Sequence, residues 1–354
     1  MGIVEKFFNT YANDIQAVVV LDEVNRYYFS GYESSFGVLL ISLEKSYFIT
    51  DPRYVNEAKN FINEEFEIVE CRGMDGAVDF VAKFVRDHSI TALGYESDTI
   101  SHNNFSLLKS IKTKLVSVSS QIARMRSIKT DEELGFIRTA SEIAEKAFNA
   151  TIKKIKSGVT ECDVMIELEH QVRLMGADGV SFDTIVAFGE RSASPHSHPQ
   201  NVKLEKGTHI LIDFGAKYNH YCSDMTRVLS LGEPSSQIRA LHSAVFDAQK
   251  YALSNIRAGL TGREIDSLSR EYLTSRGLGD KFTHALGHGV GLEIHEAPTL
   301  SQFNYDELEE NMVVTCEPGV YLEDIGGIRI EDTLIVKNNG IELLNKMSKD
   351  IIIL

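Results

Sequence analysis

Five residues in the second half of this 354-residue chain have types and spacing suited to holding two divalent cations: Asp213, Asp224, His288, Glu317 and Glu331. Four carboxylates that share one pocket repel one another unless cations offset their charge. An oxygen-rich set with one imidazole suits hard or borderline ions such as Mn²⁺ or Co²⁺ better than ions that prefer thiolates, and Zn²⁺ stays possible. The pattern therefore predicts a site for two divalent metal ions.

The two aspartates are expected on neighbouring strands of a hairpin. Asp213 ends an apolar run that starts at His209, and Asp224 follows the polar segment 217–220. Taking 217–220 as the loop and counting back places residue 213 opposite residue 224. Directly opposed Cβ atoms lie about 4.5–5.5 Å apart, where like charges destabilise the pair. A cation between the two carboxylates would turn that repulsion into coordination.

The other three candidate ligands come from later segments. Glycines on both sides of His288 permit close approach of the backbone. Glu317 stands just before a Pro-Gly turn, where a strand should end. Residues 326–336 are expected to form one strand, whose alternation places Arg329 and Glu331 on the same face.

Each of these residues also has a simpler interpretation. A lone aspartate at a strand end is usually solvated or caps a turn, and a glutamate in an alternating strand usually lies on its wet face. A histidine among glycines is commonly a loop residue with its hydrogen bonds satisfied. The metal-site interpretation is favoured only because all five residues occur together, in this order and at this spacing.

Five segments carry a resemblance to a known family: 212–216, 221–227, 287–296, 316–319 and 328–332. They resemble the pita-bread metallopeptidases, especially the branch of Xaa-Pro dipeptidase (prolidase) and Xaa-Pro aminopeptidase. The resemblance runs along the whole chain, and its specific motifs all follow residue 185. It implies an α/β N-terminal domain, an α+β pita-bread C-terminal domain and a homodimer.

The resemblance also implies roles for groups around the metals. His196 corresponds to the histidine that reaches the substrate carbonyl or the developing oxyanion, whereas His198 has no clear counterpart and is expected to be a loop residue. His295 is expected to contact substrate near proline, and His284 to line the site. Glu317 corresponds to the proton shuttle as well as a ligand.

Two further side chains are singled out by their places in the strands. Arg329 shares the expected face of Glu331, where it could orient a carboxylate or hold substrate. Thr226 could donate a hydrogen bond to a neighbouring ligand. Catalysis is thus assigned to His196, His295 and Glu317, with His284 and Arg329 as further substrate-binding residues.

The expected reaction is hydrolysis of the peptide bond that precedes proline, most readily in Xaa-Pro dipeptides. Proline leaves as a secondary amine and offers no N–H before cleavage, so a site must recognise the ring shape. An Xaa-Pro aminopeptidase acting on longer peptides is the alternative within the family. A non-catalytic pita-bread binding protein, or a metal-free amidinohydrolase relative, is the alternative from another class, and such relatives are expected to have lost ligands.

Composition narrows the class of protein. The net charge of −15 argues against a nucleic-acid partner, which normally needs a basic patch, and is explained by solubility. Four cysteines without a Cys-x-x-Cys pair are typical of a reducing compartment. No signal peptide is evident, and no apolar run approaches the roughly 18 residues of a membrane span. The expected location is the cytoplasm.

Two domains are expected, residues 1–120 and 121–354. In the first, short apolar strands at 17–21, 37–42 and 46–50 and helices at 53–61 and 74–88 indicate an α/β fold without a catalytic cluster. Residues 119–130 look like a connecting stretch. Thr130 and Glu133 then form a capping box that opens a long helix.

The second domain contains an internal repeat. Residues 155–160 recur as 256–261, an offset of 256 − 155 = 101, and Gly176 maps onto Gly277 at the same offset. Thr261 opens a capping box with Glu264, and Asp163 holds the equivalent place in the first copy. Two copies suggest a pseudo-twofold domain with its site between the halves.

Overall fold

The fold is described by a computed structural model covering residues 2–12 and 14–354. The chain divides into two compact units, the first ending at Arg126 and the second beginning at Ser127. Residue 120, the expected end of the first domain, lies inside helix α6 (Ser119–Ser127), so most of the expected connecting stretch is helical. Among the described residues, no helix has both the length and the apolar character needed to cross a membrane.

The first unit is a six-stranded sheet in the order β4-β3-β2-β1-β5-β6. The β1–β2 and β2–β3 pairs are antiparallel and the other neighbouring pairs are parallel. Its strands are β1 (Ala17–Val20), β2 (Val38–Ser42), β3 (Ser46–Thr50), β4 (Phe66–Glu70), β5 (Ala92–Tyr95) and β6 (Lys114–Ser117). Its helices are α1 (Ile3–Thr10), α2 (Glu23–Ser30), α3 (Pro52–Phe61), α4 (Gly73–Asp87) and α5 (His102–Lys109). The strands and helices expected from the apolar spacing are confirmed.

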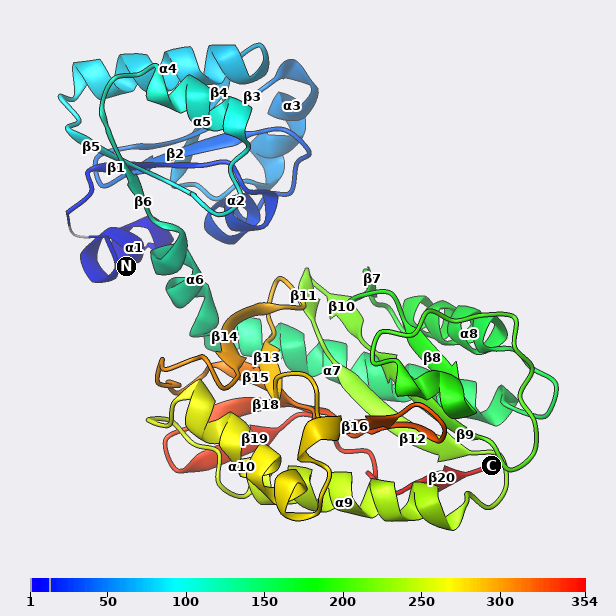
Figure 1. The fold of residues 1–354 in the computed structure, drawn as a ribbon. Helices are drawn as coiled ribbons and strands as arrows, with labels where there is room; N and C mark the ends of the chain where they lie inside the picture. The colour runs from blue at the N-terminus through cyan, green and yellow to red at the C-terminus, as the bar shows by residue number, and fades with distance from the viewer. Residues whose placement is uncertain (1, 13) are drawn as a thin grey trace. The chain divides into compact units, whose positions relative to one another are not determined.

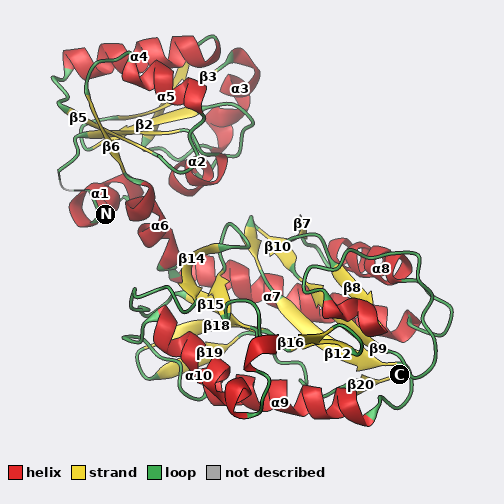
Figure 2. Ribbon diagram, viewed as in Figure 1, coloured by secondary structure: helices red, strands yellow, loops and turns green. Residues whose placement is uncertain are grey.

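Both faces of this sheet are covered, because alternate residues of its central strands enter different cores. Val18 and Val20 of β1 pack in a core that includes Phe7 of α1. Val19 packs on the other face, in a core that includes Val81 of α4. Figures 1 and 2 show α4 and α5 on one side of the sheet and α1 on the other.

The second unit holds four further sheets, in the orders β11-β10-β7, β20-β12-β9-β8, β14-β13-β15-β18-β19 and β16-β17. The strands are β7 (Gly179–Val180), β8 (Ile185–Phe188), β9 (His209–Phe214), β10 (Ala216–Tyr218), β11 (Tyr221–Cys222), β12 (Met225–Ser230), β13 (Gly287–Gly289), β14 (Glu296–Leu300), β15 (Val313–Cys316), β16 (Gly319–Leu322), β17 (Gly326–Arg329), β18 (Asp332–Lys337), β19 (Gly340–Leu343) and β20 (Ile352–Ile353). The α-helices are α7 (Asp131–Thr151), α8 (Glu161–Leu174), α9 (Ser236–Leu253) and α10 (Gly262–Ser275), and the short 3₁₀ turns are η1 (Ile152–Lys154), η2 (Gly189–Ala193) and η3 (Gly279–Lys281).

The internal repeat is confirmed at the level of local structure. Helices α8 and α10 both start at a threonine that closes a capping box, Thr160 with Asp163 and Thr261 with Glu264. The glycines that follow the helices, Gly176 and Gly277, have φ of 93° and 73°, a conformation that favours glycine.

The repeat extends to the strands. β8, β9 and β12 pack with α7 and α8 in one core, whereas β15 and β18 pack with α9 and α10 in another. In the first half β8 pairs antiparallel with β9, and in the second half β13 pairs antiparallel with β15. The unit is therefore built from two similar halves that share one architecture.

The hairpin that carries the two aspartates differs from the expected one. Lys217 pairs with Cys222 and Tyr218 with Tyr221, so the turn is two residues long, and Asp213 pairs with Thr226 instead of Asp224. The two turn residues have φ of 45° and 67°, as a type I′ turn requires. The predicted register was wrong by two positions. An even shift keeps each side chain on its face of the sheet, so both aspartates still face the same side.

The expected single strand at 326–336 is also wrong in detail. The segment forms two strands, β17 and β18, which pair with different partners: β17 with β16, and β18 with β15. The break falls at Ile330 and Glu331. Ile330 is still buried in the core, and Arg329 and Glu331 still line one common cavity, so the predicted division between faces is confirmed.

Candidate metal centre and active site

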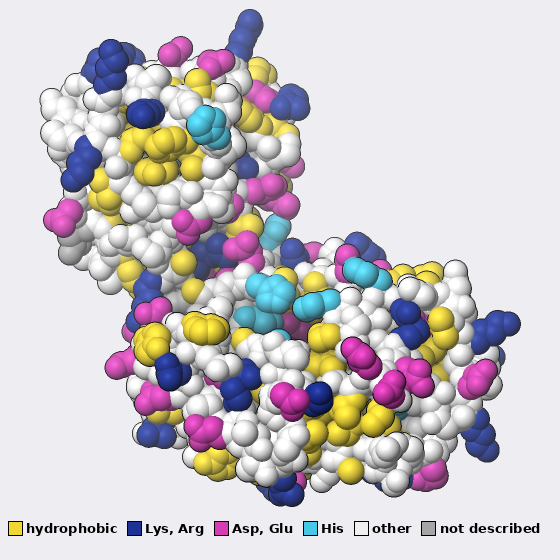
Figure 3. Space-filling view, in the orientation of Figure 1, with side chains coloured by type: hydrophobic (Ala, Val, Ile, Leu, Met, Phe, Trp, Pro, Cys, Tyr) yellow, Lys and Arg dark blue, Asp and Glu magenta, His cyan; other side chains and the backbone are white. Residues whose placement is uncertain are grey.

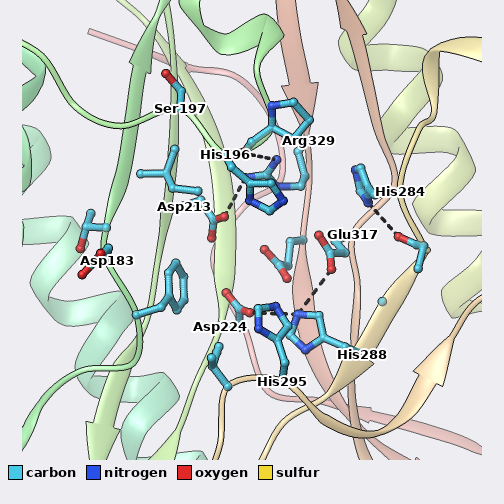
Figure 4. Close-up of a pocket in the computed structure, with 18 of the residues that line it drawn as sticks. Asp183, His196, Ser197, Asp213, Asp224, His284, His288, His295, Glu317 and Arg329 are labelled. Carbon is cyan, nitrogen blue, oxygen red and sulfur yellow. Dashed lines mark hydrogen bonds and ion pairs between the residues drawn. The ribbon is translucent and has the colours of Figure 1, made fainter.

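A cavity of about 460 Å³ in the second unit brings the predicted residues together. All five candidate ligands line it, as do the predicted substrate-binding residues His196, His284, His295 and Arg329. Figure 3 shows histidine side chains gathered around a hollow on this unit, and Figure 4 shows the labelled acids and histidines around one cavity.

Four of the five candidate ligands stand at or near strand ends or at the strand break, and His288 lies within a short strand. Asp213 is near the end of β9, Asp224 precedes β12, and Glu317 follows β15. Glu331 lies between β17 and β18, and His288 is the central residue of β13. Strand ends release the backbone from the ladder while the sheet still fixes the side-chain direction, which is why these positions can converge from two sheets.

His288 presents one ring nitrogen to the acids. Its Nε2 lies 3.5 Å from Asp224 Oδ2 and 3.5 Å from Glu317 Oε1. Its Nδ1 lies 3.1 Å from the Gly289 carbonyl oxygen, to which it can donate. A histidine that donates with Nδ1 keeps the lone pair of Nε2 for a metal ion. Ligand atoms of Asp224, His288 and Glu331 all lie within 4.8 Å of one another, the spacing of a cation site.

The carboxylates are buried together, and two of their oxygens lack hydrogen-bond partners. Oδ1 of Asp213 and Oδ1 of Asp224 are buried with no hydrogen-bond partner. Burial, reinforced by the neighbouring carboxylates, raises the pKa of Asp224 and of Glu331 well above their usual values. Burial also raises the pKa of Glu317. Buried, partnerless carboxylate oxygens beside an imidazole lone pair fit divalent cations well, because coordination would satisfy the oxygens and offset the charge.

Arg329 supplies the only guanidinium that lines this cavity among the described residues. Its Nη2 donates to Asp213 Oδ2 at 2.7 Å and its Nε donates to Thr226 Oγ1 at 3.1 Å. Thr226 Oγ1 in turn donates to Glu331 Oε2 at 2.6 Å. The hydrogen bond expected from Thr226 to a neighbouring ligand is thus present. Arg329, which was expected either to orient a carboxylate or to hold substrate, contacts the Asp213 carboxylate.

The histidines predicted to bind substrate differ in their surroundings. The ring of His295 meets that of His288 edge to face, with centroids 4.2 Å apart. His284 Nε2 lies 2.9 Å from the Tyr321 hydroxyl, and burial lowers the pKa of His284 to about 4, so this ring is neutral at pH 7. Burial is also the main cause that lowers the pKa of His295. His198, expected to be a loop residue, also lines the cavity.

Sequence reasoning missed Tyr321 and the apolar wall of the cavity. The Tyr321 hydroxyl lies between His284 and Arg329, which donates to it at 2.7 Å, and burial raises the pKa of Tyr321 to about 12. Phe182, Ile185 and Ile294 supply apolar lining. Tyr321 had one available signal, because it follows the Pro-Gly turn by two residues in a short strand. The apolar residues had none, since core and cavity walls share the same composition.

Comparisons with known proteins agree with this arrangement. Residues 135–338 match the metallopeptidase family M24, and residues 10–128 match the creatinase/prolidase N-terminal domain. The chain is 38% identical over 348 residues to the Xaa-Pro dipeptidase of Pyrococcus furiosus, covering 96% of each protein. The predicted α/β N-terminal domain and α+β pita-bread domain are confirmed.

Solved structures give the same result. The chain is similar to an Xaa-Pro dipeptidase from Bacillus anthracis, with TM-score 0.94, 41% identity and 99% coverage of each chain. It is also similar to an X-Pro aminopeptidase from Thermotoga maritima, with TM-score 0.89, 40% identity and coverage of 96% of this chain and 98% of the other. The acids, the imidazole and the full-length similarity lead to one conclusion: this chain is a member of metallopeptidase family M24.

Proposed function

We propose that this protein is an Xaa-Pro dipeptidase that uses two divalent metal ions to hydrolyse the peptide bond before proline. The observation that carries this proposal is the convergence of four carboxylates and one imidazole with partnerless buried oxygens in a single cavity. The proposed ligands are Asp213, Asp224, His288, Glu317 and Glu331. The oxygen-rich set favours Mn²⁺ or Co²⁺, and Zn²⁺ is compatible with it.

The chain's own groups divide the work of hydrolysis. Bound in this cavity, the cations would polarise the scissile carbonyl and make water a stronger nucleophile at neutral pH. Glu317 accepts the proton of the attacking water and delivers it to the departing proline nitrogen, the role that the family resemblance implies for it. His196 donates to the oxygen that becomes the oxyanion, which places a donor where charge develops.

Proline selection is assigned to the cavity wall. His295 stands beside the ligands, and Phe182 and Ile294 offer apolar surface to a five-membered ring. No part of this recognition needs an amide hydrogen on the residue after the cleaved bond, which proline does not have. His284 is a second substrate-lining residue, held by Tyr321.

The alternative within the family is an Xaa-Pro aminopeptidase that cleaves longer peptides. It is kept because the similarity to the Thermotoga maritima X-Pro aminopeptidase is nearly as high as that to the Bacillus anthracis dipeptidase. A non-catalytic binding protein is disfavoured because all five candidate ligands are present around one cavity.

The test compares substrates and metals in one assay. Gly-Pro, Ala-Pro-Ala and the non-proline dipeptide Gly-Leu are each incubated with the enzyme in Mn²⁺, in Co²⁺ and in excess chelator. We expect metal-dependent cleavage of Gly-Pro above the other two. Faster cleavage of Ala-Pro-Ala would select the aminopeptidase, and equal cleavage of Gly-Leu would remove proline specificity.

Matched variants test whether catalysis needs the Glu317 carboxylate. Glu317→Gln is expected to reduce kcat by about 10²–10⁴-fold, the usual contribution of a general acid–base group. Glu271→Gln, an exposed glutamate on α10, is the control and should keep full activity. Cleavage at the wild-type rate by Glu317→Gln would remove the assigned role.

The oligomeric state is proposed from the family resemblance, and the location from the sequence composition. We propose a homodimer and a cytoplasmic location, in keeping with the free state of all four cysteines. Sedimentation of the purified protein at several concentrations tests the dimer, and a single species of about 39.5 kDa would exclude it.

A further inference from the structure

His196 lies on an irregular segment that needs an external anchor. The segment 189–200 is the first part of the connection from β8 to β9, and its first five residues, η2, form a short 3₁₀ turn. A side chain on such a segment has no sheet or helix to fix its direction. Yet His196 must be placed accurately if it is to meet a carbonyl oxygen, since small displacements of a catalytic group are costly.

One buried carboxylate holds both ends of this segment. Glu161, the first residue of α8, is completely buried. Its Oε1 accepts from the Phe188 backbone N–H at 2.8 Å, and its Oε2 accepts from the Gln200 backbone N–H at 2.8 Å. These two amides flank the segment on either side of His196. Glu161 therefore closes the segment into a loop at its base.

Arg191 extends the anchor to the middle of the loop. Its Nε donates to the two Glu161 oxygens at 3.0 and 3.1 Å. Its Nη2 donates to the His198 carbonyl oxygen at 2.8 Å and to Ser197 Oγ at 3.3 Å. The guanidinium thus bridges the base of the loop to the two residues that follow His196.

The second half of the domain shows that the helix start itself does not need this glutamate. At the offset of 101 residues, Glu161 corresponds to Gly262, which also follows a capping threonine. A Cβ at Gly262 would lie 2.3 Å from the Thr299 carbonyl oxygen, so there the chain packs directly against the helix start. In the first half, the same place is filled by a carboxylate that binds a loop.

The Glu161–Arg191 ion pair is better suited to fixing the loop conformation than to stabilising the fold. A buried ion pair contributes little net stability compared with apolar packing, because desolvation offsets the attraction. Removing one partner nevertheless leaves the other charge buried and unpaired, and it frees the groups that the pair had oriented. Glu161 has four donor contacts in fixed directions, which selects one conformation of the loop.

We propose that Glu161 and Arg191 are positioning residues that hold His196 at the substrate carbonyl. The kinetic consequence rests on the proposed function, whereas the conformational consequence does not. Neither Glu161 nor Arg191 is among the residues that line the cavity. Its influence on catalysis therefore passes through the loop.

The experiment combines kinetics with hydrogen exchange on the full-length, manganese-loaded enzyme. Arg191→Lys keeps the positive charge but loses the planar fork, and Glu161→Gln keeps the shape but loses the charge. The matched control is Arg138→Met, which breaks a two-bond Arg138–Glu342 pair at 2.7 and 2.9 Å between α7 and β19. Arg138 does not line the cavity.

We expect both test variants to lower kcat for Gly-Pro by roughly 10-fold or more, the scale seen when groups that orient an active residue are removed. Affinity for Mn²⁺ should stay at the wild-type value. Amides in 189–200 should exchange faster in the variants, with other segments unchanged. Arg138→Met should leave kcat and this exchange unchanged. If Glu161→Gln does not fold, Arg191→Lys, at a partly exposed position, carries the test.

A double-mutant cycle separates positioning from general structural damage. In a His196→Ala background, Arg191→Lys should cause no further loss of kcat, because the group that it positions is already absent. An equal loss in both backgrounds, or unchanged exchange in 189–200, would overturn the proposal. If the wild-type enzyme cleaves no proline peptide, the proposed function fails, and the exchange measurement still decides whether the pair anchors the loop.

Discussion

Arg329 and Asp213 form a buried ion pair in which only one of the two carboxylate oxygens accepts a hydrogen bond. Arg329 Nη2 lies 2.7 Å from Asp213 Oδ2, while Asp213 Oδ1 is buried with no partner. Burial alone would lower the pKa of Arg329, but Tyr321 and the surrounding carboxylates raise it well above its usual value. The guanidinium thus keeps its charge and aims the remaining oxygen at the cavity.

Removing this guanidinium should weaken metal binding. Arg329→Met leaves Asp213 without its orienting donor, so we expect the affinity for Mn²⁺ to fall by about 10–100-fold, as for other groups that orient ligands. Isothermal titration calorimetry measures the affinity directly. Arg138→Met, at a residue that does not line the cavity, serves as the control. Wild-type affinity in Arg329→Met would contradict the orienting role.

Thr226 offers a finer test of the same network. Its hydroxyl accepts from Arg329 Nε and donates to Glu331 Oε2. Thr226→Val keeps the shape but removes both bonds, and we expect weaker Mn²⁺ binding and lower activity. Thr226→Ser retains the hydroxyl and should behave like the wild type. Equal affinities for the two variants, measured by calorimetry, would show that the hydroxyl is not needed.

The crowded carboxylates predict how stability depends on pH without metal. Because the pKa values of Asp224 and Glu331 are raised in the folded state, the unfolded chain releases these protons first as pH rises. The metal-free protein should therefore lose stability as pH climbs above the ordinary carboxyl range. Mn²⁺ replaces the protons, so it should raise Tm more at pH 8 than at pH 5.

Glu331→Gln checks the origin of that effect. Without metal, this variant should be at least as stable as the wild type at pH 8, because one buried charge is gone. With Mn²⁺ it should gain less, because a ligand is gone as well. Glu271→Gln, an exposed change, should follow the wild type in both conditions. Thermal melts with and without chelator give all the comparisons, and a full gain of Tm by Glu331→Gln would argue against its assignment as a ligand.

His209 predicts a second pH effect of opposite sign. Burial lowers the pKa of His209 to about 4, and its Nε2 lies 2.9 Å from Ser192 Oγ. Between pH 6.5 and about 4, His209 is protonated in the unfolded chain but stays neutral in the folded protein. The free energy of unfolding therefore falls as pH falls. The difference between 6.5 and about 4 corresponds to on the order of 3 kcal/mol.

Replacing this histidine should flatten the acid side of the stability curve. His209→Gln is expected to lose less stability than the wild type between pH 6.5 and pH 4, as measured by denaturant unfolding at fixed pH values. His170→Gln, an exposed change on α8, is the matched control. A wild-type slope in His209→Gln would mean that another group causes the acid sensitivity.

The sequence predicted which residues meet but not how the backbone brings them together. The candidate ligands were found because strand ends, glycines and a Pro-Gly turn mark their positions. The hairpin register was wrong because Asn219 and His220 form a type I′ turn without the usual Asn-Gly signal. The break at Ile330 could not be foreseen, because the alternation of residues continues through it while the pairing partners change.

Other parts of the site depend on contacts that no local pattern records. Tyr321, Glu161 and Arg191 each contact a residue 27 to 37 positions away in the chain. Capping boxes were predictable because each depends on a few neighbouring residues, and the internal repeat because short segments match at one offset of 101 residues. Networks across the domain become visible only once the chain is folded.

The twofold construction of the catalytic domain has a mechanical consequence. One half supplies Asp213 and Asp224, and the other supplies His288, Glu317 and Glu331. A cation bound by ligands from both halves would link the two halves to each other. Loading with Mn²⁺ should then slow hydrogen exchange in both β9 and β15. The two halves, which could unfold locally and independently without metal, should then unfold together.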